Sequence, residues 1–198
     1  MPAPAISNYV DSTVQSLYDT GTIVPAGTAM LAFFASPLGQ GATSFALAGA
    51  KTLADTNMDL AGQLPSGQNF RVLGFRAQPA FTLTGADAQN WSLGAWLVFT
   101  VGQKPYLRVP LDTVPAGMGP YGAPLAAGVA VYSHGFPSLS NAYTVGKKPL
   151  ELSSTTNFGA TMNWTTPQAV TTTIPHQPAA AGLPVRLYLD GFFFRAVQ

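Results

Sequence analysis

Apolar positions along most of the chain follow the two-residue period of β-strands. Near the C-terminus, Val185, Leu187 and Leu189 alternate with polar residues, which predicts a strand with one apolar and one polar face. Two other runs differ from this pattern: Phe70–Arg76 has apolar residues on both faces, and Trp91–Val101 is apolar at nearly every position. The length of the second run predicts a strand that is buried on both faces.

A helical period occurs once, near the N-terminus. Ile6, Val10, Val14 and Leu17 recur at intervals of three or four residues, and Gly21 can end the pattern. The spacing predicts a helix over residues 7–19, within an N-terminal helix or arm that spans residues 1–21. Because so short a helix is unstable alone, its apolar stripe is expected to dock on its own domain or on a neighbouring copy.

Residues 22–198 contain about nine short strand-like segments separated by Gly and Pro turn signals. This spacing is typical of a sandwich or barrel. We therefore predict an all-β fold, a single antiparallel β-sandwich of jelly-roll type that follows the short N-terminal helix or arm. Nothing in the sequence marks a second domain.

The C-terminal strand poses a question of register. Uninterrupted alternation would place Phe193 and Arg195 on the apolar side and would turn Phe192 and Phe194 outward. A β-bulge at Asp190–Gly191 would reverse this arrangement, because one extra residue shifts the alternation. We expect the bulge, with Phe193 and Arg195 facing a neighbouring subunit; the alternative is an unbulged strand buried on both faces, with Arg195 paired to an acid.

Composition narrows the possible functions. The chain has 198 residues, of which 47% are hydrophobic and only 9% are charged, with net charge +1 and no Cys. So little charge excludes disordered, coiled-coil and nucleic-acid-coating proteins, and no direct nucleic-acid binding is expected. Solubility of a monomer usually depends on a dense, mixed-charge surface, so this composition favours an obligate assembly.

The search for chemistry is negative. His134 and His176 lie far apart in the sequence, and no Cys accompanies them, so no metal site is predicted. The sequence also lacks the phosphate-binding motif G-x-x-x-x-G-K-[ST] and the G-x-S-x-G nucleophile motif. We predict that the protein is not an enzyme, with no catalytic, cofactor-binding or metal-binding residues. Trp91 and Trp164 are predicted to be core or interface aromatics.

No targeting or membrane-spanning segment is predicted. The first basic residue is Lys51, whereas a secretory signal begins with a positively charged region. The longest apolar stretches, Ala29–Ala35 and Gly94–Phe99, are far shorter than the ~20 residues of a membrane-spanning helix.

Three segments carry a family resemblance: Lys51–Met58, Leu60–Pro65 and Leu189–Arg195. Together with the N-terminal arm, low charge, absence of Cys and final strand, they resemble jelly-roll capsid proteins of icosahedral viruses, in particular structural proteins of tailless bacteriophages. The resemblance implies a self-assembling capsid subunit located in the virion and assembled in the host cytoplasm. It implies homo-oligomers, as trimers or pseudo-hexamers within a shell, beside other virion proteins and often above an internal membrane.

The expected assembly interface combines the N-terminal stripe with the end of the C-terminal strand: Val10, Val14, Leu17, Phe193 and Arg195. Two alternatives stay open. One is a phage decoration, tail or filament subunit, which would form helical or surface-bound arrays. The other is a glycan-binding β-sandwich that uses exposed aromatic rings, for which the candidates are Trp91, Trp96, Trp164, Tyr121 and Tyr132.

Overall fold

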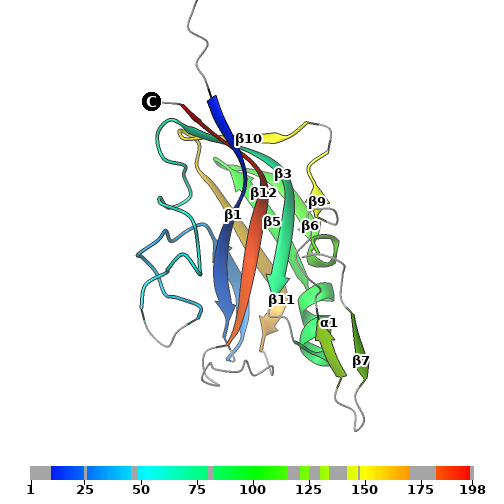
Figure 1. Ribbon diagram of the computed structural model, residues 1–198. Coiled ribbons are helices and arrows are strands. Elements are labelled where there is room, and N and C mark those ends of the chain that lie inside the picture. The colour runs from blue at the N-terminus through cyan, green and yellow to red at the C-terminus, as the bar shows by residue number, and fades with distance from the viewer. Residues whose placement is uncertain are drawn as a thin grey trace, which may run out of the picture.

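A computed structural model describes residues 10–24, 26–45, 49–79, 83–115, 121–124, 130–133, 142–146, 148–169 and 182–196. Two antiparallel sheets face each other across an apolar core (Figure 1). The five-stranded sheet contains β1 (Val10–Ile23), β12 (Leu183–Ala196), β3 (Gln68–Pro79) and β10 (Leu150–Ser153) in that order, and β9 (Tyr143–Thr144) also pairs with β3. The four-stranded sheet has the order β2 (Thr28–Phe33), β11 (Phe158–Gln168), β5 (Ala95–Val101) and β6 (Lys104–Pro110).

The pairing of these strands is nested. Among the described residues, β1 pairs with β12, β2 with β11, β3 with β10, and β5 with β6. The strands therefore behave as one long antiparallel hairpin that is rolled into two sheets, which is the topology of a jelly roll. The predicted all-β sandwich of jelly-roll type is confirmed.

Smaller elements are inserted between the strands of the sandwich. They are α1 (Gly85–Leu93), the single-turn η1 (Leu111–Thr113) and a small sheet of β4 (Leu83–Thr84), β8 (Ala130–Ser133) and β7 (Tyr121–Pro124). Helix α1 and β7 lie at the end of the sandwich opposite the point where β12 ends (Figure 1). The predicted strand Trp91–Val101 thus begins late, at Ala95, because Trp91 belongs to α1.

The predicted helix over residues 7–19 is wrong for every position that the structure describes. Val10–Ile23 forms β1 and pairs with β12 along its whole length. In a helix, Val14 and Leu17 would share one face. In a strand, side chains three residues apart point to opposite faces. Accordingly, Val14 is 67% exposed and Leu17 only 2%. A short segment rich in β-branched residues has only a weak preference for helix, and pairing with β12 outweighs it. The sandwich therefore includes residues before the predicted boundary at 21.

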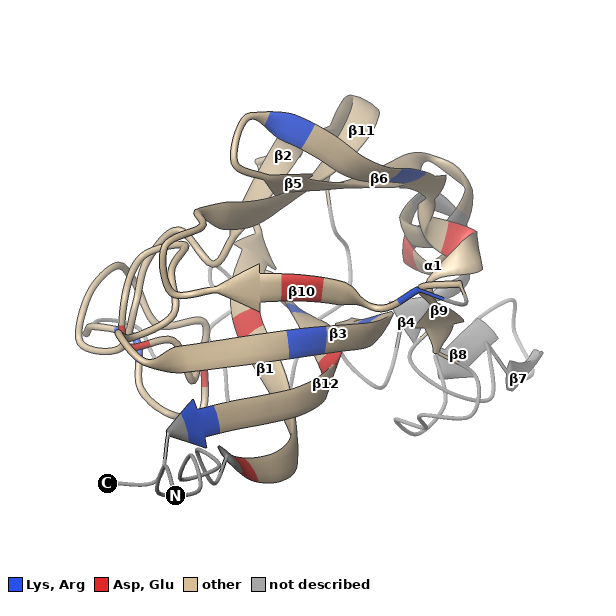
Figure 2. Ribbon diagram, turned by 90° about the horizontal axis from the view of Figure 1, so that it is seen from above, with Lys and Arg blue, Asp and Glu red and all other residues tan. Residues whose placement is uncertain are grey.

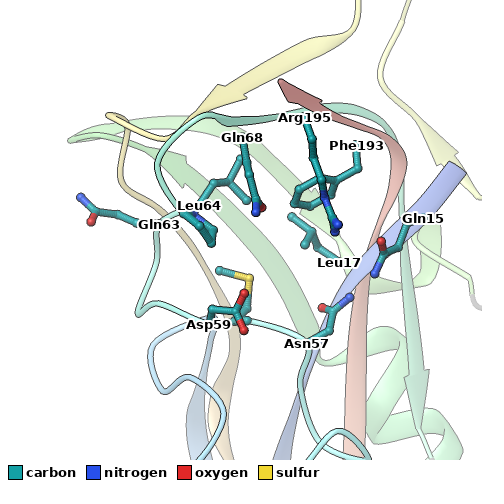
Figure 3. A pocket seen from close by; sticks show the side chains of 11 residues that line it. Gln15, Leu17, Asn57, Asp59, Gln63, Leu64, Gln68, Phe193 and Arg195 are labelled. Carbon is teal, nitrogen blue, oxygen red and sulfur yellow. The ribbon is translucent and has the colours of Figure 1, made fainter. Parts of the chain in front are cut away.

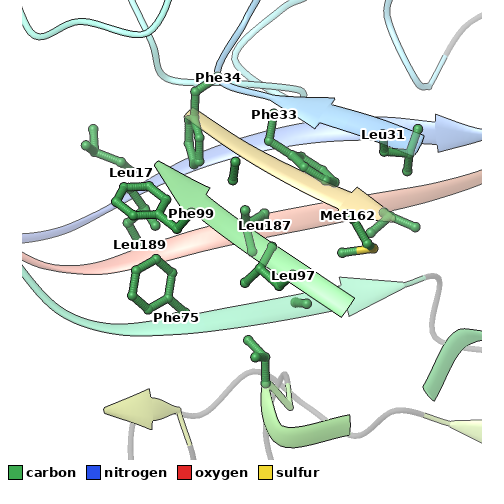
Figure 4. Packing of buried hydrophobic residues seen from close by; sticks show 14 of the residues in the cluster. Leu17, Leu31, Phe33, Phe34, Phe75, Leu97, Phe99, Met162, Leu187 and Leu189 are labelled. Carbon is green, nitrogen blue, oxygen red and sulfur yellow. The ribbon is translucent and has the colours of Figure 1, made fainter. Parts of the chain in front are cut away.

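The core lies between the two sheets (Figure 4). On β12, Val185, Leu187 and Leu189 are all fully buried, which confirms the predicted alternation. Across the core, the rings of Phe75 and Phe99 meet nearly edge to face at 5.0 Å between centroids.

The bulge lies in β3 and not in β12. Asp190 pairs with Gly74 and Gly191 with Val72, so Leu73 has no partner on β12. No register shift interrupts the pairing of β12 with β1 at this point. The extra residue changes which positions of β3 face the core, as Phe70 and Val72 do before the bulge and Phe75 and Ala77 do after it. This switch explains why apolar residues occupy even-numbered positions in the first half of β3 and odd-numbered positions in the second.

The expected bulge at Asp190–Gly191 is therefore corrected, and with it the orientation of the phenylalanines. Phe193 is 5% exposed, and its ring packs against Phe70 at 5.6 Å, whereas Phe192 and Phe194 are only half-buried, on the outer face. The unbulged alternative was right about the register. The ion pair that this alternative gave to Arg195 is not observed: Arg195 makes no salt bridge with any described residue.

Candidate functional site

One exposed region lies on the outer face of the five-stranded sheet, at the end where β1 begins and β12 ends. The register places Val14 beside Phe192, and Phe192 beside Arg71. Phe192 and Phe194 lie 6.5 Å apart, and the guanidinium of Arg71 stands 5.2 Å from the ring centre of Phe194. We call Val14, Phe192 and Phe194 the aromatic patch.

An exposed ion pair borders the aromatic patch. Arg71 Nη2 lies 2.8 Å from Glu151 Oε1, and the two side chains are 44% and 68% exposed. This pair lines two surface hollows of about 310 and 710 Å³, the first of which reaches Phe194 and the second Tyr106. An ion pair this exposed contributes ~0–1 kcal/mol to stability, so the fold depends little on it.

Further along the same face, charge is buried. Arg76 Nε and Nη2 donate hydrogen bonds of 2.5 and 2.8 Å to the two oxygens of Asp190. Ser16 Oγ donates to the same carboxylate at 2.5 Å, and the ring of Tyr188 lies 4.4 Å from the Arg76 guanidinium. The Arg76 and Asp190 side chains are only 7% and 4% exposed. A buried charge of this kind requires its partner.

The segment around Asn57 covers part of the free edge of β1. Tyr18 N–H donates to Asn57 Oδ1 at 2.9 Å, and Asn57 Nδ2 donates to the Ser16 carbonyl at 2.9 Å. Nearby, the Tyr18 hydroxyl donates to the Leu53 carbonyl at 2.5 Å, and Arg186 donates to the Ala54 carbonyl. The loop therefore takes the place of a neighbouring strand over this stretch of β1.

A second buried ion pair ties this loop to β1. Lys51 Nζ lies 2.5 Å from Asp19 Oδ1, and Phe34 N–H donates to Asp19 Oδ2 at 2.5 Å. Burial raises the pKa of Asp19, and this effect outweighs the Lys51 ammonium, the Phe34 N–H and the Thr56 hydroxyl, which lower it.

Asp55 is a structural anchor and not a solvated loop carboxylate. It is fully buried and accepts hydrogen bonds from the Thr43 hydroxyl, the Ser44 N–H, and the N–H and hydroxyl of Thr52. Burial raises the pKa of Asp55, but these hydrogen bonds more than offset it, so that the pKa lies below its ordinary value.

A small cavity of about 50 Å³ lies at the end of the sandwich (Figure 3). The amide side chains of Gln15, Asn57, Gln63 and Gln68 surround it, and Arg195 lies over the ring of Phe193 at 5.1 Å. A cavity of this size holds one or two water molecules, since each occupies ~30 Å³ in the liquid. It is too small for a sugar or nucleotide.

The other exposed region is the outer face of the four-stranded sheet. It is formed by the outward-facing residues of β2, β5 and β11, which we call the uncharged face: Met30, Ala32, Trp96, Val98, Thr100, Gly159, Thr161 and Asn163. Met30 is 57% and Trp96 39% exposed, and both pair with Asn163 in one row. Figure 2 shows no charged residue on these three strands; the charges of this sheet, Lys104 and Arg108, stand on β6.

The structure separates the residues predicted for the assembly interface. Val14 and Arg195 are exposed, but Leu17 and Phe193 pack inside the chain's own core and offer no surface to a neighbour. Val10 lies opposite Ala196 in the register of β1 and β12, and its side chain lies outside the described part of the chain. A register without a bulge in β12 would have identified Phe192 and Phe194 in their place.

The aromatic residues predicted for the core or for glycan binding divide in the same way. Trp91 and Trp164 are 3% and 4% exposed with rings 6.5 Å apart, which confirms their placement in the core and removes them as sugar platforms. Trp96 is exposed. The side chains of Tyr121 and Tyr132, and His134 and His176 entirely, lie outside the described residues.

Within the described ranges, no three His, Cys, Asp or Glu side chains are grouped so as to hold a metal ion. The same part of the chain has no helix long and apolar enough to cross a membrane. Searches with family models, among curated proteins and among solved structures found no match to this chain.

Proposed function

We propose that this protein is a non-catalytic structural subunit that assembles with further copies of itself into a virion shell. The observation that carries the proposal is the uncharged face. Three adjacent strands present a surface without a single charged side chain, and Met30 and Trp96 stand exposed upon it.

The composition of the uncharged face suits burial in a contact between proteins. Removing a charge from water is costly unless the charge is paired, and the cores of protein interfaces are depleted of charged residues and enriched in Trp and Met. Thr161 and Asn163 add hydrogen-bonding groups between the apolar side chains. Docking on this face therefore carries no penalty for desolvating a charge.

The fold is compatible with this role but does not single it out. Jelly rolls occur in viral capsid proteins, lectins and cupins alike, and function has to be argued from surfaces. The low charge of the whole chain and the sequence resemblance to tailless-phage structural proteins support a bacteriophage capsid subunit. A decoration, tail or filament subunit would use the same face in a different array.

The proposal is tested by the mass and shape of the purified protein, from light scattering and electron microscopy. We expect closed shells or their oligomeric units. Met30→Asp and Trp96→Asp should each abolish assembly, because they place a charge on the face. Leu53→Asp is the matched control, since Leu53 is an exposed apolar residue, at 66%, in a loop away from this face.

Several outcomes would contradict the proposal. One is a wild-type protein that stays monomeric at high concentration. Another is assembly that survives both face variants, or that the Leu53→Asp control abolishes equally. Helical arrays in the micrographs would favour the filament or tail role over the shell.

A glycan-binding module is the second candidate, favoured by the exposed ring of Trp96 beside the amide of Asn163. Aromatic rings with an adjacent amide can stack on and hydrogen-bond to sugars. In that case a monomeric wild type should bind glycans in an array, and Trp96→Asp should lose the binding. Binding that is unaffected by this substitution would remove the candidate.

A further inference from the structure

Part of the free edge of β1 is not covered by any segment that the structure describes. Within a strand, the N–H and C=O of one residue point to the same side, and successive residues alternate between sides. The backbone groups of Ser16 and Tyr18 point away from β12, because they form hydrogen bonds with Asn57 on the other side of β1. By alternation, the backbone groups of Ser12 and Val14 also point away from β12.

These backbone groups have no partner among the described residues. Of the described strands, only β12 pairs with Ser12 and Val14, and it lies on the other side; the Asn57 contacts begin at Ser16. Residues 11–15 are all exposed.

The open edge has little of the usual protection. Natural sheets guard free edges with charged side chains, especially Lys, with Pro or with a bulge. Residues 11–15 contain a single charge, Asp11, and neither Lys nor Pro, and the pairing of β1 with β12 is regular along this stretch. Such an edge is a template for an added strand.

We infer that this edge pairs in antiparallel fashion with the same edge of a second copy, about a two-fold axis at Ser12. The inference deepens the proposed function and rests on it, since it names one contact of the assembly. In this register each Val10 lies opposite Val14 of the second copy, and each Asp11 opposite Thr13. No like charges face each other, so the edge is complementary to itself.

The neighbouring contacts select this register. A two-fold axis at Val14 would pair Ser12 with Ser16, whose carbonyl already accepts the hydrogen bond from Asn57 Nδ2. The axis at Ser12 leaves that contact intact. It also joins the two five-stranded sheets into one and brings the two aromatic patches together across the axis, which covers Val14, now 67% exposed.

The absence of Cys makes the register directly testable. A cysteine at the axis faces its own copy, at the ~5.5 Å between Cα atoms of a hydrogen-bonded pair, which lies within the range that a disulfide spans. Under mild oxidation we expect Ser12→Cys to form a disulfide-linked dimer that reductant reverses. Gln15→Cys is the matched control on the same strand: its two copies would stand about six residues, or roughly 20 Å, apart, so it should give little dimer.

A second pair of variants tests the backbone contact without oxidation. Ser12→Pro removes the N–H that points to the free edge and leaves the pairing with β12 intact, so it should lose the dimer contact. Ser12→Ala keeps that N–H and should keep the contact. Equal cross-linking of the two cysteine variants, no cross-linking of Ser12→Cys, or a Ser12→Pro protein that associates like wild type would each overturn the inference.

These failures differ from failure of the proposed function. A wild type that forms shells while Ser12→Cys stays reduced would overturn the edge contact alone. A wild type that stops at a dimer, with Ser12→Cys linked, would support the edge contact and contradict the proposed shell.

Discussion

The outer faces of the two sheets differ in charge: the five-stranded sheet contains a buried ion pair, and the four-stranded sheet has three adjacent strands without charge. On the five-stranded sheet, Arg76 and Asp190 form a buried ion pair, and the loop through Lys51 and Asn57 closes over β1. On the four-stranded sheet, the uncharged face stands open, with its cations on β6 at the margin. The charges of Arg76 and Asp190 are therefore part of the folded structure of one face, whereas β2, β5 and β11 carry no charge on the other.

The difference has a physical consequence. Buried ion pairs fix geometry because each member requires the other, although they are weak contributors to net stability. An open face without charges needs no such partners and can be buried later, in a contact with another protein. Substitutions on the first face should therefore change folding, and under the proposed function those on the second should change association.

The largest expected effect comes from breaking the buried pair. Arg76→Met leaves the Asp190 carboxylate buried without its cation, which typically costs about 3–5 kcal/mol. Chemical denaturation should show this loss. The double variant Arg76→Met with Asp190→Leu should regain most of the stability, because no charge then remains unpaired; a double variant as unstable as the single one would show that packing, and not charge, dominates.

The next effect concerns the backbone beside the β3 bulge. A Cβ at Gly191 would lie 1.9 Å from the Arg71 carbonyl oxygen, whereas one at Gly159 on β11 would meet nothing closer than 3.9 Å. Gly191→Ala should lower the unfolding free energy by about 1–3 kcal/mol or more. Gly159→Ala should be neutral or should stabilise by about 0.4–1 kcal/mol. Similar thermal melting shifts for the two variants would contradict a close approach specific to the bulge.

A smaller effect depends on pH. Because the pKa of Asp55 is lowered in the folded chain, its stabilising contribution is complete above the ordinary pKa of an aspartate and is lost as the pH falls through the lowered value. Asp55→Asn should therefore differ most from wild type at neutral pH and least in acid, as measured by denaturation at both. Asp59→Asn, an exposed carboxylate in the same segment, is the control and should change stability by no more than about 0.5 kcal/mol. A gap for Asp55→Asn that widens in acid would reverse the assigned sign.

The smallest effect is expected at the exposed ion pair. Glu151→Gln should change the unfolding free energy by less than about 1 kcal/mol, and salt should reduce the difference further. Comparing the loss of stability in Glu151→Gln with that in Arg76→Met shows how burial changes the contribution of an Arg–carboxylate pair, since both pairs lie on one sheet. A loss as large as that of Arg76→Met would mean that Arg71 and Glu151 support the fold.

Sequence reasoning succeeded where one strand face is purely apolar. The alternation of Val185, Leu187 and Leu189 predicts their burial, and the turn signals predict a β-sandwich. It failed near the N-terminus, because Val10, Val14 and Leu17 satisfy a helical period, whereas in the strand that they form Val14 and Leu17 lie on opposite faces. Only the presence of β12 beside them decides between the two.

The bulge shows the same limit in another form. Both β3 and β12 carry apolar residues on both parities near Gly74 and Gly191, so either strand could hold the extra residue. Gly191 is required not by a bulge in β12 but by the close approach of the Arg71 carbonyl across the strand pair. Neither the candidate surface nor the orientation of Phe193 follows until that choice is made.

The sequence by itself determined the strand-rich class, the low charge and the apolar faces, because alternation and composition are local properties of the chain. Tertiary structure decided which strand bulges, which phenylalanine is buried, and which carboxylates are paired. These outcomes depend on residues distant in the chain, as Arg76 and Asp190 are, and the free energy of a buried charge or ring is fixed by whatever neighbour the fold places against it.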